Sequence, residues 1–368
     1  METLAFGAVE IDRAPDGSHV IRMQQPYSSY AKALTERQKY PDLRLYPGGP
    51  PKRPYDVTAH TLPLLFGVDV QFVDSPIQGP FRRERYPFFA GGRDSYSASD
   101  TDTWFTVNRM WRLKRDVWRN EATGDFSATG AGPGWKLVMP PRIAVYKSWM
   151  PSMDEGWTRW LLEQFGFDYT SVRNADIQKG ELRAKYDVIL FPDQSATEIR
   201  NGYATGRMPE EFTGGVGTQG AAALKQFAEA GGKLVFLNHS TAYATSTLGI
   251  NAKNVVAGVS NKDYYSPGSL LNVRLNLKNP LTRGLPESLA IWSEGSPAFE
   301  TAEESAANYP DSGLLASGWL LGEKLIAKRS ALVDARLGSG HVVLFGFRPQ
   351  YRAQSYQTFK MLFNAFVM

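Results

Sequence analysis

The chain has 368 residues, enough for two or three domains with a sizeable core. Its 41 basic and 37 acidic side chains are interleaved and give a net charge of +4, so we expect no nucleic-acid partner. No apolar run approaches the roughly 20 residues that cross a bilayer, so we expect no membrane association. The lack of cysteine excludes disulfides, thiolate zinc sites and cysteine nucleophiles.

The first 140 residues predict short elements separated by loops. Apolar runs on either side of Ala14-Pro15-Asp16-Gly17 predict a β-hairpin within residues 1–25. Met1-Glu2 and the run that follows lack the pattern of a signal peptide. Residues 26–140 predict a mixed α+β module. Its expected elements are helices at 28–38, 58–66 and 103–113, a strand at 68–73 and a loop at 75–95.

Residues 141–368 predict an α/β domain. Runs that are apolar throughout are typical of strands buried on both faces, and helical patterns separate them here. We therefore expect a doubly wound, mostly parallel sheet. The expected strands are 142–146, 168–172, 187–191, 233–237 and 341–346, with further strand-like segments at 270–277 and 314–319. The expected helices are 152–165, with Trp157, Trp160, Leu161 and Phe165 on one face, then 176–183, 219–230 and 354–366, and a long loop covers 193–217.

Two motif searches predict that the chain binds neither a cofactor nor a metal. Residues 215–220 match Gly-x-Gly-x-x-Gly, but the dinucleotide fingerprint needs a strand directly before it, and here a loop is expected. The histidines are His19, His60, His239 and His341, and the closest two are 41 residues apart. No local pair of metal ligands exists, so we expect no zinc site.

The ends of the predicted strands define a candidate pocket, because ligands of open parallel sheets bind outside the carboxyl ends. Arg348 is the strongest candidate for ligand contact, since a guanidinium can fork onto a carboxylate. An internal ion pair of Arg348 with Asp154 or Glu155 is an equal alternative. The candidate ligand-binding residues are Arg348, Gln350, Asp193, His239 and Ser148.

A catalytic alternative stays open at the same place. His239 and Ser240 are weak candidates for base and nucleophile, with Asp193 as the orienting carboxylate. The sequence around Ser240 lacks the Gly-x-Ser-x-Gly elbow, which favours helix capping by Ser240 or Thr241 over catalysis. We therefore expect no catalytic residue, while a hydrolase or amidase remains the rival hypothesis.

The region from about residue 142 resembles the class I glutamine amidotransferase fold. In that family a cysteine occupies the turn after a central strand, and a His-Pro-Glu triplet lies on the last strand. Here the turn is Leu237-Asn238-His239-Ser240, and the triplet is Arg348-Pro349-Gln350. Arginine is no base near neutral pH and glutamine carries no charge. The resemblance implies a flavodoxin-like fold whose reactive groups are replaced.

A second resemblance covers the chain from about Tyr30 onwards. Four segments, 36–44, 54–59, 152–159 and 346–350, are similar to the C-terminal region of bacterial carboxypeptidase A-like zinc peptidases. In those proteins an amidotransferase-like accessory domain follows the zinc peptidase domain. The resemblance makes the hairpin a peptidase remnant or linker sheet, and it implies kinship to peptidases without their zinc motif.

This second resemblance also carries expectations about role, partners and location. It implies a non-catalytic accessory domain that binds a peptide, a glycan or a protein. The expected protein partner is a zinc peptidase domain or a second copy of the chain. If the chain follows the family, it lies in the periplasm or outside the cell.

Overall fold

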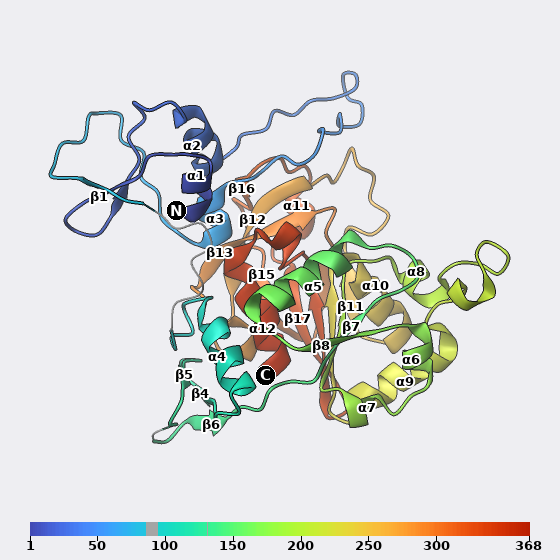
Figure 1. Cartoon of the computed structure of the whole chain (residues 1–368). Helices are drawn as coiled ribbons and strands as arrows, with labels where there is room; N and C mark the ends of the chain where they lie inside the picture. The colour runs from blue at the N-terminus through green and yellow to red at the C-terminus, as the bar shows by residue number, and fades with distance from the viewer. Residues whose placement is uncertain (86–94, 131) are drawn as a thin grey trace.

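The computed structural model describes residues 1–85, 95–130 and 132–368, and a large mixed sheet lies at its centre (Figure 1). One half is parallel, in the order β8-β7-β9-β10-β18. In chain order this is 2-1-3-4-5, the flavodoxin-like order, which confirms the predicted doubly wound sheet. The strands are β7 (Ile143–Tyr146), β8 (Tyr169–Val172), β9 (Val188–Phe191), β10 (Lys233–Leu237) and β18 (Gly340–Phe345).

Helices cover both faces of this parallel half, which explains why its inner strands β7, β9, β10 and β18 are largely apolar. In β7, Ile143 and Val145 pack with α5 and α12, whereas Ala144 and Tyr146 pack with the helices of the opposite face. The first layer consists of α5 (Met153–Phe165) and α12 (Phe359–Val367). The second contains α6 (Asn174–Gln178), α7 (Leu182–Lys185), α8 (Ala196–Asn201), α9 (Gly217–Glu229) and α10 (Thr241–Tyr243).

Antiparallel strands extend the sheet beyond β18, in the order β17, β15, β12 and β13. The two strand-like segments expected at 270–277 and 314–319 belong to this extension, as β12 and β16. The strands are β11 (Ala252–Asn254), β12 (Pro267–Leu275), β13 (Ser288–Glu294), β14 (Phe299–Thr301), β15 (Glu304–Asn308), β16 (Leu315–Ser317) and β17 (Ser330–Leu337), with the short helix α11 (Glu323–Ile326).

The N-terminal region contains two small antiparallel sheets and four helices among its described residues. The predicted turn at Ala14–Gly17 is present, and Ala14 and Ser18 close it by a backbone hydrogen bond of 2.9 Å. The elements are α1 (Glu2–Phe6), β1 (Asp12–Arg13), β2 (His19–Val20), α2 (Ser28–Thr35), α3 (Leu62–Phe66), β3 (Arg82–Arg83), α4 (Thr103–Arg112), β4 (Trp118–Asn120), β5 (Phe126–Ser127) and β6 (Trp135–Leu137).

Two strand predictions in this region are wrong. Leu4 and Phe6 belong to helix α1, because only Leu4 of the alternating run finds a core to pack against. Val68, Val70 and Phe72 are exposed and lie outside any strand, since no described strand offers them a partner. Within the predicted loop at 75–95, residues 86–94 lie outside the described part of the chain.

The α/β region also departs from the sequence pattern in places. The helix expected over 176–183 is divided at Gly180, whose φ of +74° ends α6. The loop expected at 193–217 contains α8. The last helix begins five residues late, because Ser355 (ψ +61°) interrupts the helical backbone and a 3-10 turn follows it. Trp157 and Trp160 are exposed, so the buried face of α5 is narrower than the pattern indicated.

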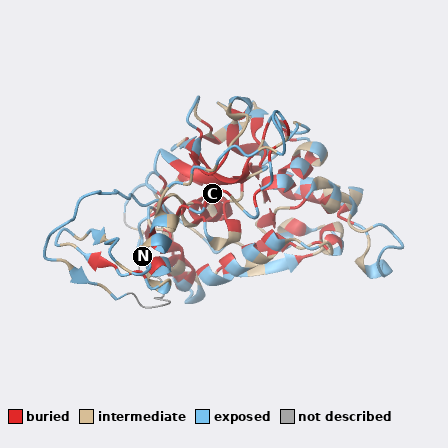
Figure 2. Ribbon diagram, turned by 90° about the horizontal axis from the view of Figure 1, so that it is seen from above, coloured by how far each residue is buried: buried red, intermediate tan, exposed pale blue. Residues whose placement is uncertain are grey.

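Helix α4 of the N-terminal region shares a hydrophobic core with the α/β region, whereas Leu4, Val9, Ile11 and Ala31 form a separate buried cluster. Trp104, Val107 and Met110 of α4 lie in the same buried cluster as α5 and α12. Figure 2 shows the buried residues running through the sheet and into the helices on either side. The predicted boundary at residue 140 stays a prediction.

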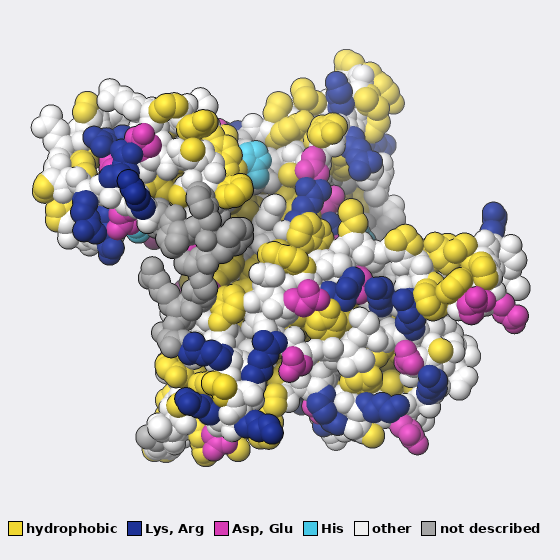
Figure 3. Space-filling view, in the orientation of Figure 1, with side chains coloured by type: hydrophobic (Ala, Val, Ile, Leu, Met, Phe, Trp, Pro, Cys, Tyr) yellow, Lys and Arg dark blue, Asp and Glu magenta, His cyan; other side chains and the backbone are white. Residues whose placement is uncertain are grey.

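The molecular surface carries mixed charge. Figure 3 shows basic and acidic side chains interspersed over the face in view. Among the described helices, none combines the length and apolarity that a membrane span requires.

Candidate functional site

Three of the predicted site residues meet at the carboxyl edge of the parallel strands. Asp193 follows β9, His239 follows β10 and Arg348 follows β18. Arg348 Nη2 lies 2.6 Å from Asp193 Oδ2, and His239 Nδ1 lies 3.0 Å from Asp193 Oδ1. The expectation that functional side chains gather at the carboxyl ends of the strands therefore identified three residues that are in contact, with Asp193 at the centre.

The guanidinium of Arg348 is bound by carboxylates of this chain. Besides Asp193 it contacts Asp154 Oδ2 at 3.1 Å and Glu294 Oε2 at 2.7 Å. Asp154 lies in the first turn of α5 and Glu294 at the end of β13. The internal ion pair with Asp154 is thus observed, whereas Glu155 pairs with Arg159. The Arg348 guanidinium, which we expected to bind a ligand carboxylate, is therefore bound by carboxylates of the chain itself.

The charges of this cluster shift one another's proton affinity. Burial alone would raise the pKa of Asp193, but the hydrogen bond from His239 and the Arg348 guanidinium hold it well below its usual range. The same hydrogen bond raises the pKa of His239. Burial raises the pKa of Asp154, against the opposing effect of Arg348. Asp193 is therefore the ionised partner that both cations share.

His239 has the geometry of an oriented imidazole. Asp193 Oδ1 accepts from the backbone N–H of His239 at 2.9 Å, and the ring Nδ1 contacts the same oxygen. The same Nδ1 lies 2.9 Å from Asn238 Nδ2, so Asp193 favours a proton on Nδ1 whereas Asn238 favours a lone pair there. Half of the side chain is exposed (50%). The imidazole is therefore oriented by a carboxylate and accessible from solvent.

Asn238 occupies the sharp turn after β10. Its φ of +51° marks the strained strand-to-helix elbow. Its Nδ2 donates to Asp193 Oδ2 at 3.0 Å, and its buried Oδ1 has no partner within the described structure. A carboxamide is no nucleophile, so this elbow presents an anchoring group to the cluster.

Ser240 does not join His239. Its buried hydroxyl donates to the carbonyls of Phe191 at 3.0 Å and Leu237 at 2.8 Å, the last residues of β9 and β10. The predicted helix capping is also wrong, because Thr241 Oγ1 likewise donates to a carbonyl, that of Asn238, at 2.6 Å. Both hydroxyls stabilise the elbow backbone.

Gln350 and Ser148 lie apart from the charged cluster. Gln350 is fully buried, and its Nε2 donates to Thr158 Oγ1 of α5 at 3.1 Å. It therefore holds α5 against the last strand. Ser148 follows β7, where its hydroxyl donates to the Met150 carbonyl at 2.8 Å and accepts from Gln194 Nε2 at 2.8 Å.

A pocket of about 290 Å³ adjoins the cluster at the carboxyl ends of β7, β8 and β9. The strand order reverses between β7 and β9, the position where doubly wound sheets bind ligands. The Arg173 guanidinium lies over the Trp149 ring, 3.4 Å from its centroid. The lining residues are 146–152, Glu155, Arg173, Pro192 and Gln194.

Arg173 has no carboxylate partner among residues 1–85, 95–130 and 132–368. Its Nη1 reaches only the Ser148 carbonyl, at 3.5 Å, and Glu155 in the same pocket is bound to Arg159 at 2.6 Å. The pocket therefore presents two cations without an ion pair in the described residues, Arg173 and Lys147, next to the hydroxyl of Ser148 and the amide of Gln194. A carboxylate is the natural complement of such a guanidinium.

The described residues offer no group of three or more His, Asp or Glu side chains arranged for a metal ion. The Gly-x-Gly-x-x-Gly segment follows α8 and a loop, in place of the strand that the dinucleotide fingerprint requires. Its Gly215 packs against the backbone of Arg200. This close approach explains the glycine without a cofactor.

No protein-family model matches the chain, and no curated protein matches it. Among solved structures it is similar to a ThuA-like protein from Bacteroides uniformis (13% identity, 62% of this chain and 90% of that chain, TM-score 0.35). It is also similar to PurLQS from Thermotoga maritima (15% identity, 61% and 99%, TM-score 0.41). A third is a cytoplasmic protein from Salmonella typhimurium (12% identity, 61% and 96%, TM-score 0.39).

The fold assignment rests on the strand order of this chain itself. The resemblance to zinc carboxypeptidases stays a prediction.

Sequence reasoning missed three members of these two sites as candidates. Arg173 directly follows the predicted strand at 168–172, so the strand-end rule would have found it had it been applied there. Asn238 was part of the quoted turn, but only its positive φ identifies it as the elbow residue. Glu294 ends an antiparallel strand, and no sequence signal placed that strand beside Arg348.

Proposed function

We propose that this chain is a non-catalytic binding domain that holds a ligand by its carboxylate in the pocket beside Trp149. The observation that carries the proposal is Arg173, a guanidinium without a carboxylate partner in the described structure, on the wall of that pocket. The ligand class is the free C-terminus of a peptide. This choice keeps the accessory role that the resemblance to peptidases implies.

The pocket is preorganised for one carboxylate. Trp149 fixes the plane of the Arg173 guanidinium, and Phe212 supports Trp149 from the side with ring centroids 4.7 Å apart. A guanidinium held in this way donates two parallel hydrogen bonds at little entropic cost. Ser148 and Gln194 supply polar groups for the adjacent peptide bond. A volume of about 290 Å³ suits a terminal residue.

The test compares N-acetyl dipeptides that end in Ala, Lys, Glu or Phe, each as free acid and as amide, by calorimetry. We expect at least one acid to bind and its amide to bind at least ten-fold more weakly. Arg173→Met removes the preference, and Arg173→Lys keeps part of it. Lys179 directly follows helix α6 and forms an exposed ion pair with Asp176. Lys179→Met is therefore the matched control and leaves binding unchanged. Equal binding of acids and amides, or no binding of any acid, contradicts the proposal.

A hydrolase is the second candidate, and one specific observation favours it. The oriented, half-exposed imidazole of His239 is suited to activating a water molecule, with Asp193 holding the ring in place. The described cluster provides no serine nucleophile, so the attacking group would be water.

This second candidate is tested with glutamine and with aminoacyl p-nitroanilides as substrates. A hydrolase predicts turnover that His239→Asn abolishes, with His60→Asn as the control. It also predicts activity that rises as the pH increases through the elevated pKa of His239, since only the neutral ring is a base. No turnover, or turnover that survives His239→Asn, excludes this function.

A further inference from the structure

A second pocket lies at the opposite edge of the sheet, at the amino ends of the parallel strands. Its volume is about 500 Å³. Pro141 precedes β7, Asp187 precedes β9 and Lys233 begins β10, while Arg119 and Lys136 reach it from β4 and β6. The N-terminal region and the α/β region thus build this pocket together.

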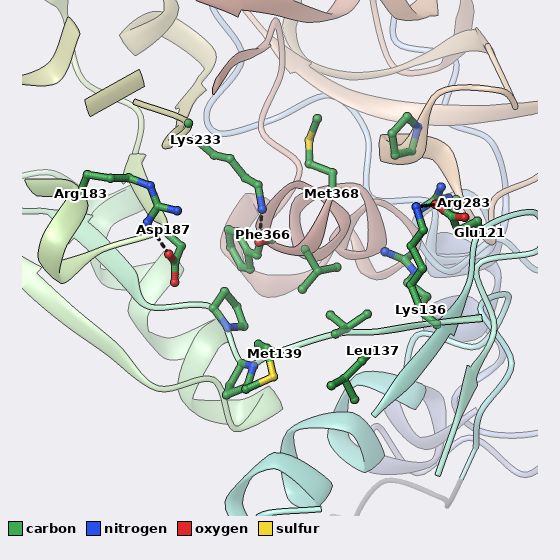
Figure 4. Close-up of a pocket in the computed structure, with 17 residues that line it drawn as sticks. Glu121, Lys136, Leu137, Met139, Arg183, Asp187, Lys233, Arg283, Phe366 and Met368 are labelled. Carbon is green, nitrogen blue, oxygen red and sulfur yellow. Dashed lines mark hydrogen bonds and ion pairs between the residues drawn. The ribbon is translucent and has the colours of Figure 1, made fainter. Parts of the chain in front are cut away.

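Basic side chains outnumber acidic ones around this pocket. Lys136 pairs with Glu121 at 2.5 Å, and Arg183 pairs with Asp187 at 2.6 Å. These pairs engage both lining carboxylates, and Figure 4 shows them on opposite sides of the pocket. Arg119, Lys233 and Arg283 then remain, and within the described residues no carboxylate forms an ion pair with any of the three.

Arg119 is the most deeply buried of these cations. Only 3% of the residue is exposed. Its Nη2 donates to Asn364 Oδ1 at 2.5 Å and its Nε to the Gly124 carbonyl at 3.2 Å, but its buried Nη1 has no hydrogen-bond partner. A buried, unpaired guanidinium nitrogen costs free energy unless a ligand satisfies it.

The other two cations likewise form no ion pair within the described residues. There the Lys233 Nζ donates to the Phe366 carbonyl, at 3.0 Å. Burial lowers the pKa of Lys233 to about 8 and that of Arg119 to about 9, and it lowers the pKa of Arg283. Each shift has desolvation as its largest cause, and the nearby carboxylates Asp125, Asp187 and Glu121 offset it only in part.

The rest of the lining is apolar. Figure 4 shows Leu137 and Met139 facing Phe366 and Met368 between the two charged sides. Val138, Val367 and three prolines complete this surface. A pocket of this kind complements a molecule with a charged head and an apolar body.

We propose that this pocket binds an organic anion, a phosphate or carboxylate group attached to an alkyl or similarly apolar portion. Arg119 and Arg283, which lie close enough to influence each other's charge, bind the anionic group, and the side chains around Phe366 contact the apolar portion. The site is separate from the peptide-carboxylate pocket, which lies at the other edge of the sheet.

The experiment measures binding of octyl phosphate, octanoate, octyl glucoside and inorganic phosphate to the full chain by calorimetry. We expect at least one octyl anion to bind at least ten-fold more tightly than neutral octyl glucoside and than inorganic phosphate. The tighter of the two octyl anions identifies the head group. Equal binding of octyl glucoside, equal binding of inorganic phosphate, or no binding of either octyl anion overturns the proposal.

Variants locate the binding within the chain. Arg283→Met weakens binding at least ten-fold, and Arg283→Lys restores part of it. Lys225 forms an exposed ion pair with Glu229 on α9, so Lys225→Met is the matched control and leaves binding unchanged. Circular dichroism of each variant confirms that it folds. Full binding by folded Arg283→Met places the anion elsewhere and overturns the proposal.

Discussion

Arg348 determines whether the acidic side chains at the carboxyl edge of the sheet can stay buried. Asp154 and Asp193 are less than a tenth exposed, and the guanidinium contacts both, together with Glu294. Removing the cation leaves carboxylates in a poorly solvated place without compensation.

We therefore expect Arg348→Met to lower the free energy of unfolding by about 3–5 kcal/mol, measured by urea denaturation. Arg352→Met is the matched control, because its ion pair with Asp56 at 2.8 Å is largely solvated. That change is expected to cost at most about 1 kcal/mol. Equal losses in the two variants would show that Arg348 has no special electrostatic role.

His239 makes the stability of the cluster depend on pH. Its pKa is raised in the folded protein, so protonation favours folding. This stabilisation is fully present below the unfolded pKa of about 6.5 and is lost as the pH rises through the folded pKa. We expect the wild-type chain to have a higher free energy of unfolding than His239→Gln at low pH, and this difference to disappear as the pH rises over that interval. Denaturation curves recorded at several pH values measure it.

Asp193→Asn tests the cause of this shift. It removes the hydrogen-bonded negative charge, so the His239 titration followed by NMR is expected to move to lower pH. A titration that stays in place would assign the raised pKa to another group.

At the scale of elements, α5 depends on its first turn. Ser152 caps the helix by accepting from the Glu155 N–H at 3.2 Å, and its hydroxyl donates to the Asp193 carbonyl at 2.9 Å. The cap therefore joins α5 to the loop that carries the cluster. Ser152→Ala is expected to lower the free energy of unfolding by about 1 kcal/mol in thermal or urea denaturation. Ser152→Thr keeps the hydroxyl and is expected to lose less, whereas equal losses would contradict the capping role.

Strands that are buried on both faces could be predicted from the sequence. Elements that are exposed, or that depend on a distant partner strand, could not. Four of the five parallel strands, β7, β9, β10 and β18, are largely apolar and buried, a pattern that few other structures satisfy, whereas β8 at the edge is half exposed. The run at 68–73 is equally rich in β-formers but stays outside any strand, because a strand needs a partner that local sequence does not specify. The strand ends also predicted Asp193, His239 and Arg348 as neighbours, since parallel strands present them at one edge.

At the scale of the whole molecule, helix α4 and the α/β region share a core, so we expect the two to unfold together. Trp104 of α4 contacts Phe363 of α12, with ring centroids 5.6 Å apart, and Phe167 before β8 at 5.7 Å. Trp104→Ala is expected to lower the free energy of unfolding by about 3–5 kcal/mol. Calorimetry is expected to show a single transition that moves to lower temperature. Two transitions, with only one displaced, would establish independent domains.

The sequence by itself determined the fold class, the order of the parallel strands along the chain, and the edge at which polar side chains gather. Periodicity and strand ends are local properties, so they can be recognised from the sequence alone. Only the tertiary structure decided that Arg348 is held by internal carboxylates, that Asn238 occupies the elbow, and that Arg119, Lys233 and Arg283 line one pocket. Ion pairing and burial depend on contacts between segments that are far apart in the sequence, and only the packing of the whole chain determines those contacts.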